Sequence, residues 1–368
     1  MLREVLQAVT RASSLVDRGV LRVMERRMSE TAPRHAVPAD ARVRLLELAR
    51  VYQDGTLGHP SRFFAEPDAA EVVERPAGHA FGVPVTDLTF ASSYQPFFAD
   101  YRLEHHRWVE NHTAHARHYG HGGGRPVMVC LHGWGGGTWW LEERAFVIGY
   151  WLAHGFDVVL FQLPFHGARA PIAPGGGRGR SGALFPSAHL VRTNEAFGQA
   201  IHDLRALRAH LSAGGAGPVG AIGMSLGGYT TALWATIDPA LAFAVAMIPA
   251  VSMSDLMWRH GEDSPARRRA LQAGVSVDLL HDVFAVHAPT TRAPLVARER
   301  LMIVAGRGDQ ITPPDQAERL WRHWGECAIH WFPGGHLAQV GRGDAFRAVR
   351  RHLRAAGFGV DSAPGPRP

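Results

Sequence analysis

Short apolar runs alternate with longer amphipathic stretches through residues 126–355. The apolar runs fall at residues 126–131, 156–163, 219–222, 241–248, 301–305 and 328–332. Runs of this kind, without polar alternation, are typical of strands buried on both faces. The stretches with helical periodicity include residues 138–154, 187–211, 315–324 and 337–355. This alternation predicts an α/β fold whose mostly parallel sheet is flanked by helices.

The remaining segments define the expected domain organisation. Residues 1–100 are expected to form an N-terminal amphipathic helix and a loop-rich extension, with a candidate edge strand at residues 85–90. Residues 101–356 are expected to form the main α/β domain, with helical cap insertions at about residues 165–187 and 252–294. Residues 357–368, rich in Pro and Gly, are expected to be a disordered tail.

Composition narrows the class of protein. The net charge of +6 comes with 33 acidic residues, and the 39 basic residues are all arginine and are scattered along the chain. A nucleic-acid site needs basic residues clustered on one face, so we expect no nucleic-acid partner. No apolar run reaches membrane-spanning length and no secretory signal is evident, which favours a cytoplasmic protein. Cys130 and Cys327 lack metal-ligand spacing and are interpreted as buried thiols.

Histidines are dense between residues 102 and 121, which raises the question of a metal site. If residues 111–119 are extended, a period of two places His112 and His118 on one face and His115 and His121 on the other. The chain has 22 histidines, so this density is interpreted as a surface strand. We therefore expect no metal and no other cofactor.

The segment Gly223-Met224-Ser225-Leu226-Gly227 follows an apolar run and precedes a helical stretch. This is the context of a nucleophile elbow, in which Ser225 adopts a strained backbone at the tip of a strand-to-helix turn. The supporting small residues Gly223 and Gly227 allow strand and helix to approach closely. The helix N-terminus directs N–H groups toward developing negative charge.

Three further loops follow expected strands and carry candidate chemistry. The loop His132-Gly133-Trp134-Gly135 can turn tightly and present a backbone N–H, with the N–H groups of Trp134 and Leu226 as the candidate pair. Asp309 and His336 lie on the loops after the last two expected strands. Loops at the carboxyl ends of parallel strands meet at one edge of the sheet. Acyl transfer needs a hydroxyl, an imidazole and an orienting carboxylate, and these loops supply all three.

These motifs, in the order Ser, Asp, His, resemble the serine hydrolases of the α/β-hydrolase fold over about residues 126–355. The resemblance implies Ser225 as nucleophile, His336 as general base and acid, and Asp309 as its orienting acid. It also implies an oxyanion hole made by the N–H groups of Trp134 and Leu226, supported by His132 and Gly133. A weaker likeness, carried by the loop at residues 163–167, the pair of insertions and the long N-terminal segment, is to hydrolases that act on phospholipid acyl chains.

Several alternatives remain open at this stage. Asp255 is a rival to Asp309 and His330 a rival to His336, although His330 lies within an expected strand. The favoured activity is carboxylic ester hydrolysis on a small acyl ester or a lipid. Thioesterase, amidase or acyltransferase activity would share the same acyl-enzyme, and a catalytically silent scaffold used for binding is the alternative from another class.

The N-terminal segment at residues 1–28 predicts one long amphipathic helix. Its apolar stripe consists of Leu2, Val5, Leu6, Val9, Val16, Val20, Val23 and Met24. The stripe has no Trp or Phe to anchor it at a headgroup boundary, so we favour protein contact, within the chain or in a homodimer, over peripheral contact with an anionic membrane. Removal of this helix is then expected to promote aggregation or loss of a dimer without abolishing the chemistry at Ser225.

Overall fold

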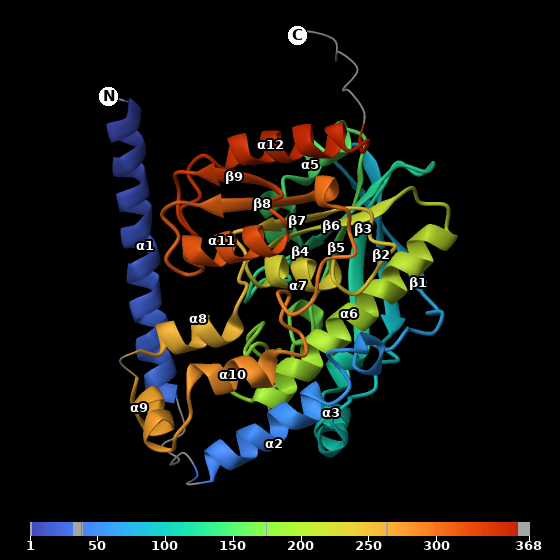
Figure 1. Ribbon diagram of the computed structural model, residues 1–368. Coiled ribbons are helices and arrows are strands. Elements are labelled where there is room, and N and C mark those ends of the chain that lie inside the picture. Colours follow the sequence, from blue (N-terminus) through green and yellow to red (C-terminus); the bar gives the residue numbers. More distant parts are fainter. Residues whose placement is uncertain (1, 32–37, 39, 174, 263, 360–368) are drawn as a thin grey trace.

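A single nine-stranded sheet forms the centre of the computed structural model, which describes residues 2–31, 38, 40–173, 175–262 and 264–359 (Figure 1). The strand order is β1-β2-β3-β5-β4-β6-β7-β8-β9, parallel from β5 to β9 and antiparallel among β1, β2, β3 and β5. The strands are β1 (Val73–Ala80), β2 (Val83–Ala91), β3 (Thr113–Tyr119), β4 (Val127–Leu131), β5 (Asp157–Phe161), β6 (Val219–Met224), β7 (Ala244–Met247), β8 (Leu301–Gly306) and β9 (Ala328–Phe332).

Helices cover both faces of this sheet. The described α-helices are α1 (Leu2–Thr31), α2 (Ala41–Gln53), α3 (Arg102–Arg107), α4 (Trp139–Ala145), α5 (Ile148–Ala153), α6 (Leu190–Ala213), α7 (Leu226–Trp234), α8 (Met253–His260), α9 (Pro265–Gln272), α10 (Val277–Phe284), α11 (Pro314–His323) and α12 (Arg342–Ala355). Helices α5 and α12 lie on one face, and α6, α7 and α11 lie on the other (Figure 1). The α/β fold with a mostly parallel sheet is confirmed.

Strand β4 shows how the sequence specifies two core layers. Successive side chains of a strand point to opposite faces of the sheet. Val127 and Val129 accordingly pack in the layer beneath α6 and α7, whereas Met128 and Cys130 pack in the layer beneath α5 and α12. All five residues of β4 are buried, which explains its unbroken apolar pattern.

The expected helix at residues 138–154 is instead two short helices, α4 and α5. Val147 separates them with a left-handed backbone, at φ +49°. A left-handed residue interrupts the hydrogen-bond pattern of a helix. The Nε1–H of Trp151 donates to the Phe146 carbonyl oxygen at 2.9 Å, so a carbonyl at the break has a partner. Hydrophobic periodicity continues across the break because both helices pack on the same face of the sheet.

The last helix begins at Arg342, later than the expected residue 337. Residues 334–340 form a tight turn in which the Gly334 N–H donates to the Val340 carbonyl oxygen at 3.1 Å. Gly341 then adopts φ +92°, a conformation that glycine tolerates. This turn occupies the residues expected to begin the helix, and His336 lies on the loop, as expected.

The N-terminal extension contributes directly to the sheet. Strand β2 contains the candidate edge strand at residues 85–90, but it pairs with β1 on one side and β3 on the other. The true edge strand on this side is β1, most of whose residues are exposed. Sequence reasoning missed β1 because Pro76 and Gly78 interrupt its pattern. The tail at residues 360–368 lies outside the described residues.

Helix α1 stands beside the loops that follow β8 and β9 (Figure 1). Three described residues of its apolar stripe, Val5, Val16 and Val20, are 54%, 48% and 36% exposed. For these residues the chain itself does not supply the expected protein contact, because the helix docks through a neighbouring polar face. The side chains of Leu2, Val23 and Met24 lie outside the described residues. None of the described helices is both long and apolar enough to cross a membrane.

A buried ion pair fixes the loop after β5 against α6. Arg169 donates from Nη2 to Asp203 Oδ2 at 2.8 Å and to the Asn111 carbonyl oxygen at 2.9 Å. Neither side chain of the ion pair is exposed. Removing one member of a buried pair leaves an uncompensated charge, whereas an exposed pair contributes little.

We therefore predict that Asp203→Asn lowers the free energy of unfolding by about 3–5 kcal/mol. Asp40→Asn, which breaks an exposed pair with Arg44, serves as the matched control and should change it by no more than about 0.5 kcal/mol. Chemical denaturation of both variants measures this difference. Equal effects of the two substitutions would show that burial of the Arg169 pair has no energetic consequence.

Candidate active site

The candidate nucleophile, Ser225, lies between β6 and α7 with a strained backbone. Its φ of +57° and ψ of −113° fall in a region that residues other than glycine rarely adopt, at a cost of about 1–3 kcal/mol. Its side chain is half-buried, whereas the rest of β6 and α7 is buried. The fold thus presents this hydroxyl at the carboxyl edge of the sheet.

The two elbow glycines are required by close contacts. A Cβ on Gly223 would lie 2.1 Å from the Gly227 carbonyl oxygen. A Cβ on Gly227 would lie 1.8 Å from the Leu131 carbonyl oxygen, at the end of β4. Both distances are far inside van der Waals contact. Glycine at these positions lets α7 pack directly against β4 and β6.

The candidate oxyanion loop lies next to the elbow. A Cβ built on Gly133 would be 3.4 Å from Ser225 Cβ. Among the described residues, the backbone N–H groups of Trp134 and Leu226 have no hydrogen-bond acceptor. Two unpaired donors beside a half-buried serine are what a developing oxyanion requires.

His132 holds this loop in place as a buried, neutral side chain. Its Nδ1–H donates to the Gly133 carbonyl oxygen at 2.8 Å, and its Nε2 accepts from the Leu163 N–H at 3.1 Å. Burial lowers the pKa of His132, which keeps the ring uncharged and able to accept. The Trp134 indole donates to the Gly182 carbonyl oxygen at 2.7 Å, so the segment between β5 and α6 contacts the loop.

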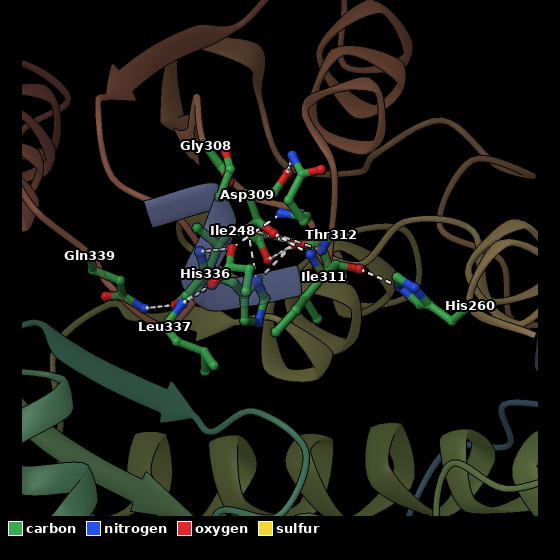
Figure 2. A network of polar contacts seen from close by, with 12 residues as sticks. Ile248, His260, Gly308, Asp309, Ile311, Thr312, His336, Leu337 and Gln339 are labelled. Atoms are coloured by element: carbon green, nitrogen blue, oxygen red, sulfur yellow. Dashed lines mark hydrogen bonds and ion pairs between the residues drawn. The ribbon is translucent and has the colours of Figure 1, made fainter. Parts of the chain in front are cut away.

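Asp309 and His336 form a buried hydrogen-bonded pair (Figure 2). Nδ1 of His336 lies 2.8 Å from Oδ2 of Asp309. The other carboxylate oxygen, Oδ1, accepts from the N–H groups of Ile311 at 2.9 Å and Thr312 at 2.7 Å. The Thr312 hydroxyl lies 3.0 Å from Oδ2. These bonds fix the carboxylate and leave Nε2 of His336 as the nitrogen that can exchange a proton with substrate or serine.

The electrostatic environment favours protonation of His336. Burial by itself lowers the pKa of His336, but the Asp309 carboxylate and its hydrogen bond raise it, as does the more distant Asp17. The net direction is upward. An imidazolium formed at this position is therefore stabilised, which is the property a general base needs after it accepts a proton.

The structure brings Ser225, Asp309, His336, Trp134 and Leu226 to the same edge of the sheet. One contact of a catalytic triad, the one between serine and histidine, is not formed in the described part of the chain. Among the described residues, no hydrogen bond joins the Ser225 hydroxyl to His336. Such bonds are often long in proteins without ligand and tighten with substrate bound. The rival acid, Asp255, contacts His281 at 2.8 Å and Arg319 at 2.7 Å instead. The rival base, His330, lies on β9, as expected.

Sequence reasoning missed the contribution of α1 to this site. Asp17 is fully buried, and its carboxylate accepts from the backbone N–H of His336 at 2.7 Å. The signal was present in the sequence: Thr10, Ser14 and Asp17 recur at helical spacing next to the apolar stripe. A face of small polar residues on a helix indicates docking against backbone groups. A search for apolar residues at helical spacing does not detect such a face.

Three histidines outside this site gather more closely than their spacing predicted. The ligand atoms of His105, His106 and His112 lie within 4.8 Å of one another. The rings of His105 and His112 are stacked, and burial together with the neighbouring histidines lowers the pKa of His105 to about 4. Neutral imidazoles are the form that could bind a transition metal. No hydrogen bond or ring contact joins this cluster to Ser225, Asp309 or His336 in the described part of the chain.

Comparison with known proteins places the fold. A family model described as the alpha/beta hydrolase fold matches residues 126–272. An uncharacterized protein of Mycobacterium tuberculosis is 32% identical over 321 residues, which cover 82% of this chain and 71% of the relative. A second uncharacterized protein from another strain of that species is 31% identical over 319 residues, which cover 82% and 70% of the two chains.

Solved structures agree with this assignment. An acetyl xylan esterase from Paenibacillus sp. R4 has a TM-score of 0.54 at 14% identity, covering 88% of this chain and 98% of that esterase. Acetyl xylan esterase 1 from Thermoanaerobacterium sp. JW/SL YS485 has a TM-score of 0.51 at 17% identity, covering 89% and 98%. The protein belongs to the α/β-hydrolase fold family and has an N-terminal helix. The expectation of a helical insertion at residues 165–187 is wrong, because this segment is irregular and contains only the 3-10 helix Gly167–Arg169, whereas residues 252–294 contain α8, α9 and α10.

The Asp309 contact predicts the protonation behaviour of His336 before any activity is measured. In an NMR titration of the imidazoles, His336 is expected to titrate above the ordinary value of about 6.5. Asp309→Asn should lower this midpoint because the carboxylate no longer stabilises the imidazolium. Asp255→Asn is the matched control and should leave it unchanged. The His336 signal is assigned by its loss in His336→Ala, and a midpoint indifferent to Asp309→Asn would contradict the pairing.

Proposed function

We propose that this protein is a serine hydrolase that cleaves a carboxylic ester through an acyl-enzyme on Ser225. The observation that carries the proposal is the buried Asp309–His336 pair at the same sheet edge as the strained Ser225 elbow. Ester hydrolysis is also supported by the two acetyl xylan esterases among the structural neighbours, although at their low identity the likeness concerns the fold. The substrate class we propose is a small acyl ester or a lipid ester.

The proposed reaction uses the same groups in both of its halves, acylation and deacylation. The Ser225 oxygen attacks the ester carbonyl carbon while Nε2 of His336 takes the hydroxyl proton. The carbonyl oxygen becomes an oxyanion and accepts from the N–H groups of Trp134 and Leu226. As the carbon–oxygen bond breaks, His336 returns the proton to the leaving alcohol. Water then attacks the acyl-enzyme in the same manner, which releases the acid and restores Ser225.

Neighbouring activities would use the same intermediate. A thioester or amide could replace the ester as substrate, and an alcohol in place of water would make the enzyme an acyltransferase. The runner-up from a different class is a silent scaffold that binds without turnover. The unpaired N–H donors and the hydrogen-bonded acid–base pair favour an active enzyme, because binding alone requires neither.

We predict that a fluorophosphonate probe labels Ser225 and no other residue. Among the serines in the described part of the chain, only Ser225 has both unpaired oxyanion donors and a buried acid–base pair nearby. Mass spectrometry of peptides from the labelled protein identifies the site. Ser225→Ala should lose labelling and should lower ester turnover by about 10⁴ to 10⁶-fold. An adduct on another residue, or an active Ser225→Ala variant, contradicts the assignment.

We further predict that His336→Ala is about as damaging as Ser225→Ala, and that Asp309→Asn costs somewhat less. Combining them should add little, because the three residues act as a unit. Activity should fall on the acid side as His336 becomes protonated, with a midpoint above about 6.5 given its raised pKa. Steady-state kinetics on an ester substrate measure each effect. If Asp309→Asn keeps its activity while Asp255→Asn loses it, the orienting acid is Asp255 and not Asp309.

A further inference from the structure

Helix α1 contacts the two loops that carry the candidate acid and base. The Thr10 hydroxyl donates to the Pro333 carbonyl oxygen at 2.9 Å, on the loop that leads to His336. One turn later, the Ser14 hydroxyl donates to the Gly308 carbonyl oxygen at 2.8 Å, on the loop that carries Asp309. The helix therefore touches both loops before Asp17 is considered.

Asp17 joins these loops through three backbone N–H groups. Its Oδ2 accepts from Gln310 at 3.1 Å and from His336 at 2.7 Å, and its Oδ1 accepts from Leu337 at 3.0 Å. Gln310 directly follows Asp309, and Leu337 directly follows His336. The blue ribbon of α1 passes beside Asp309 and His336 in Figure 2. One carboxylate thus fixes the backbone of both catalytic candidates relative to each other.

The chemistry of this position calls for a carboxylate. Three N–H donors converge on a side chain with no exposed surface. An ionised carboxylate accepts at both oxygens, and hydrogen bonds to a charged acceptor are stronger than neutral ones. An asparagine would turn an NH₂ group toward at least one of these donors. Close packing leaves little room for adjustment, because a Cβ on Gly335 would lie 2.6 Å from Asp17 Oδ2.

We propose that Asp17 is a positioning residue for the hydrolase reaction, and that its bridge between the 308–312 and 334–337 loops holds the His336 imidazole against Asp309. This inference rests on the proposed function. Asp17 acts through the backbone of the loops and does not touch substrate. Loss of α1 then disturbs the chemistry at Ser225, which differs from the sequence expectation that the helix is dispensable for it.

The charge of Asp17 has a second consequence for His336. The charged groups that face His336 are Asp309, on the loop after β8, and Asp17, on α1. Burial lowers the pKa of His336, and both carboxylates raise it. Neutralising Asp17 therefore lowers this pKa and moves the acid side of the activity profile to lower pH, even as loosened loops slow the reaction.

The test compares full-length wild type with Asp17→Asn and Ser14→Ala on a p-nitrophenyl ester across pH. For Asp17→Asn we expect kcat to fall by about 10- to 100-fold, the scale of effect that a small misplacement produces, with KM little changed. Its acid-side midpoint should shift to lower pH. Ser14→Ala removes one contact from the same helix face without removing charge, so its midpoint should remain at the wild-type value.

Wild-type kcat together with a wild-type midpoint in Asp17→Asn would overturn the inference. So would an equal midpoint shift in Ser14→Ala, because loosened docking would then explain it. Should Asp17→Asn fail to fold, Asp17→Glu replaces it: lowered kcat with an unshifted midpoint supports the proposal, and unchanged kcat contradicts it. Failure of the proposed function would give a different result, because the wild-type protein itself would then show no fluorophosphonate adduct on Ser225. An NMR titration of His336 would still report the effect of the Asp17 charge in that case.

Discussion

The close approach of the elbow to strand β4 is the constraint on which the rest of the site depends. Helix α7 can begin directly behind Ser225 only because Gly223 and Gly227 leave no side chain between backbones that would otherwise overlap. That approach brings Gly133 beside Ser225, and in the described part of the chain the N–H groups of Trp134 and Leu226 have no acceptors. Helix α7, which follows Ser225, packs its apolar side chains in the buried core. This packing offsets the backbone strain at Ser225.

The acid and base are organised by a different kind of interaction. Their loops lie outside the core and are fixed by hydrogen bonds to charged and polar side chains, above all the carboxylates of Asp309 and Asp17. The polar face of α1 completes this arrangement, while Val5, Val16 and Val20 of its neighbouring apolar stripe stay exposed. A homodimer and an anionic membrane surface remain the two candidates to cover that stripe.

The sequence was sufficient for features whose signal is local. The strand at 328–332 was predicted to the residue, and Ser225, Asp309 and His336 were predicted to lie after strands, where the structure has them. Features set by tertiary contacts were not accessible in this way. The break at Val147 and the late start of α12 depend on packing and on a turn that periodicity does not encode. Asp17 was missed because its partners are backbone amides about 300 residues away in the chain, which leave no pattern around it.

The most direct test of the proposed site is a crystal structure of the protein after reaction with a fluorophosphonate. We predict phosphorus bonded to the Ser225 oxygen, with a non-bridging oxygen about 2.7–3.1 Å from the backbone nitrogens of Trp134 and Leu226. We also predict Nε2 of His336 within hydrogen-bond distance of the Ser225 oxygen, and Nδ1 still bonded to Asp309. An adduct on Ser225 whose phosphoryl oxygen points away from both amides, or a His336 directed elsewhere, would contradict it.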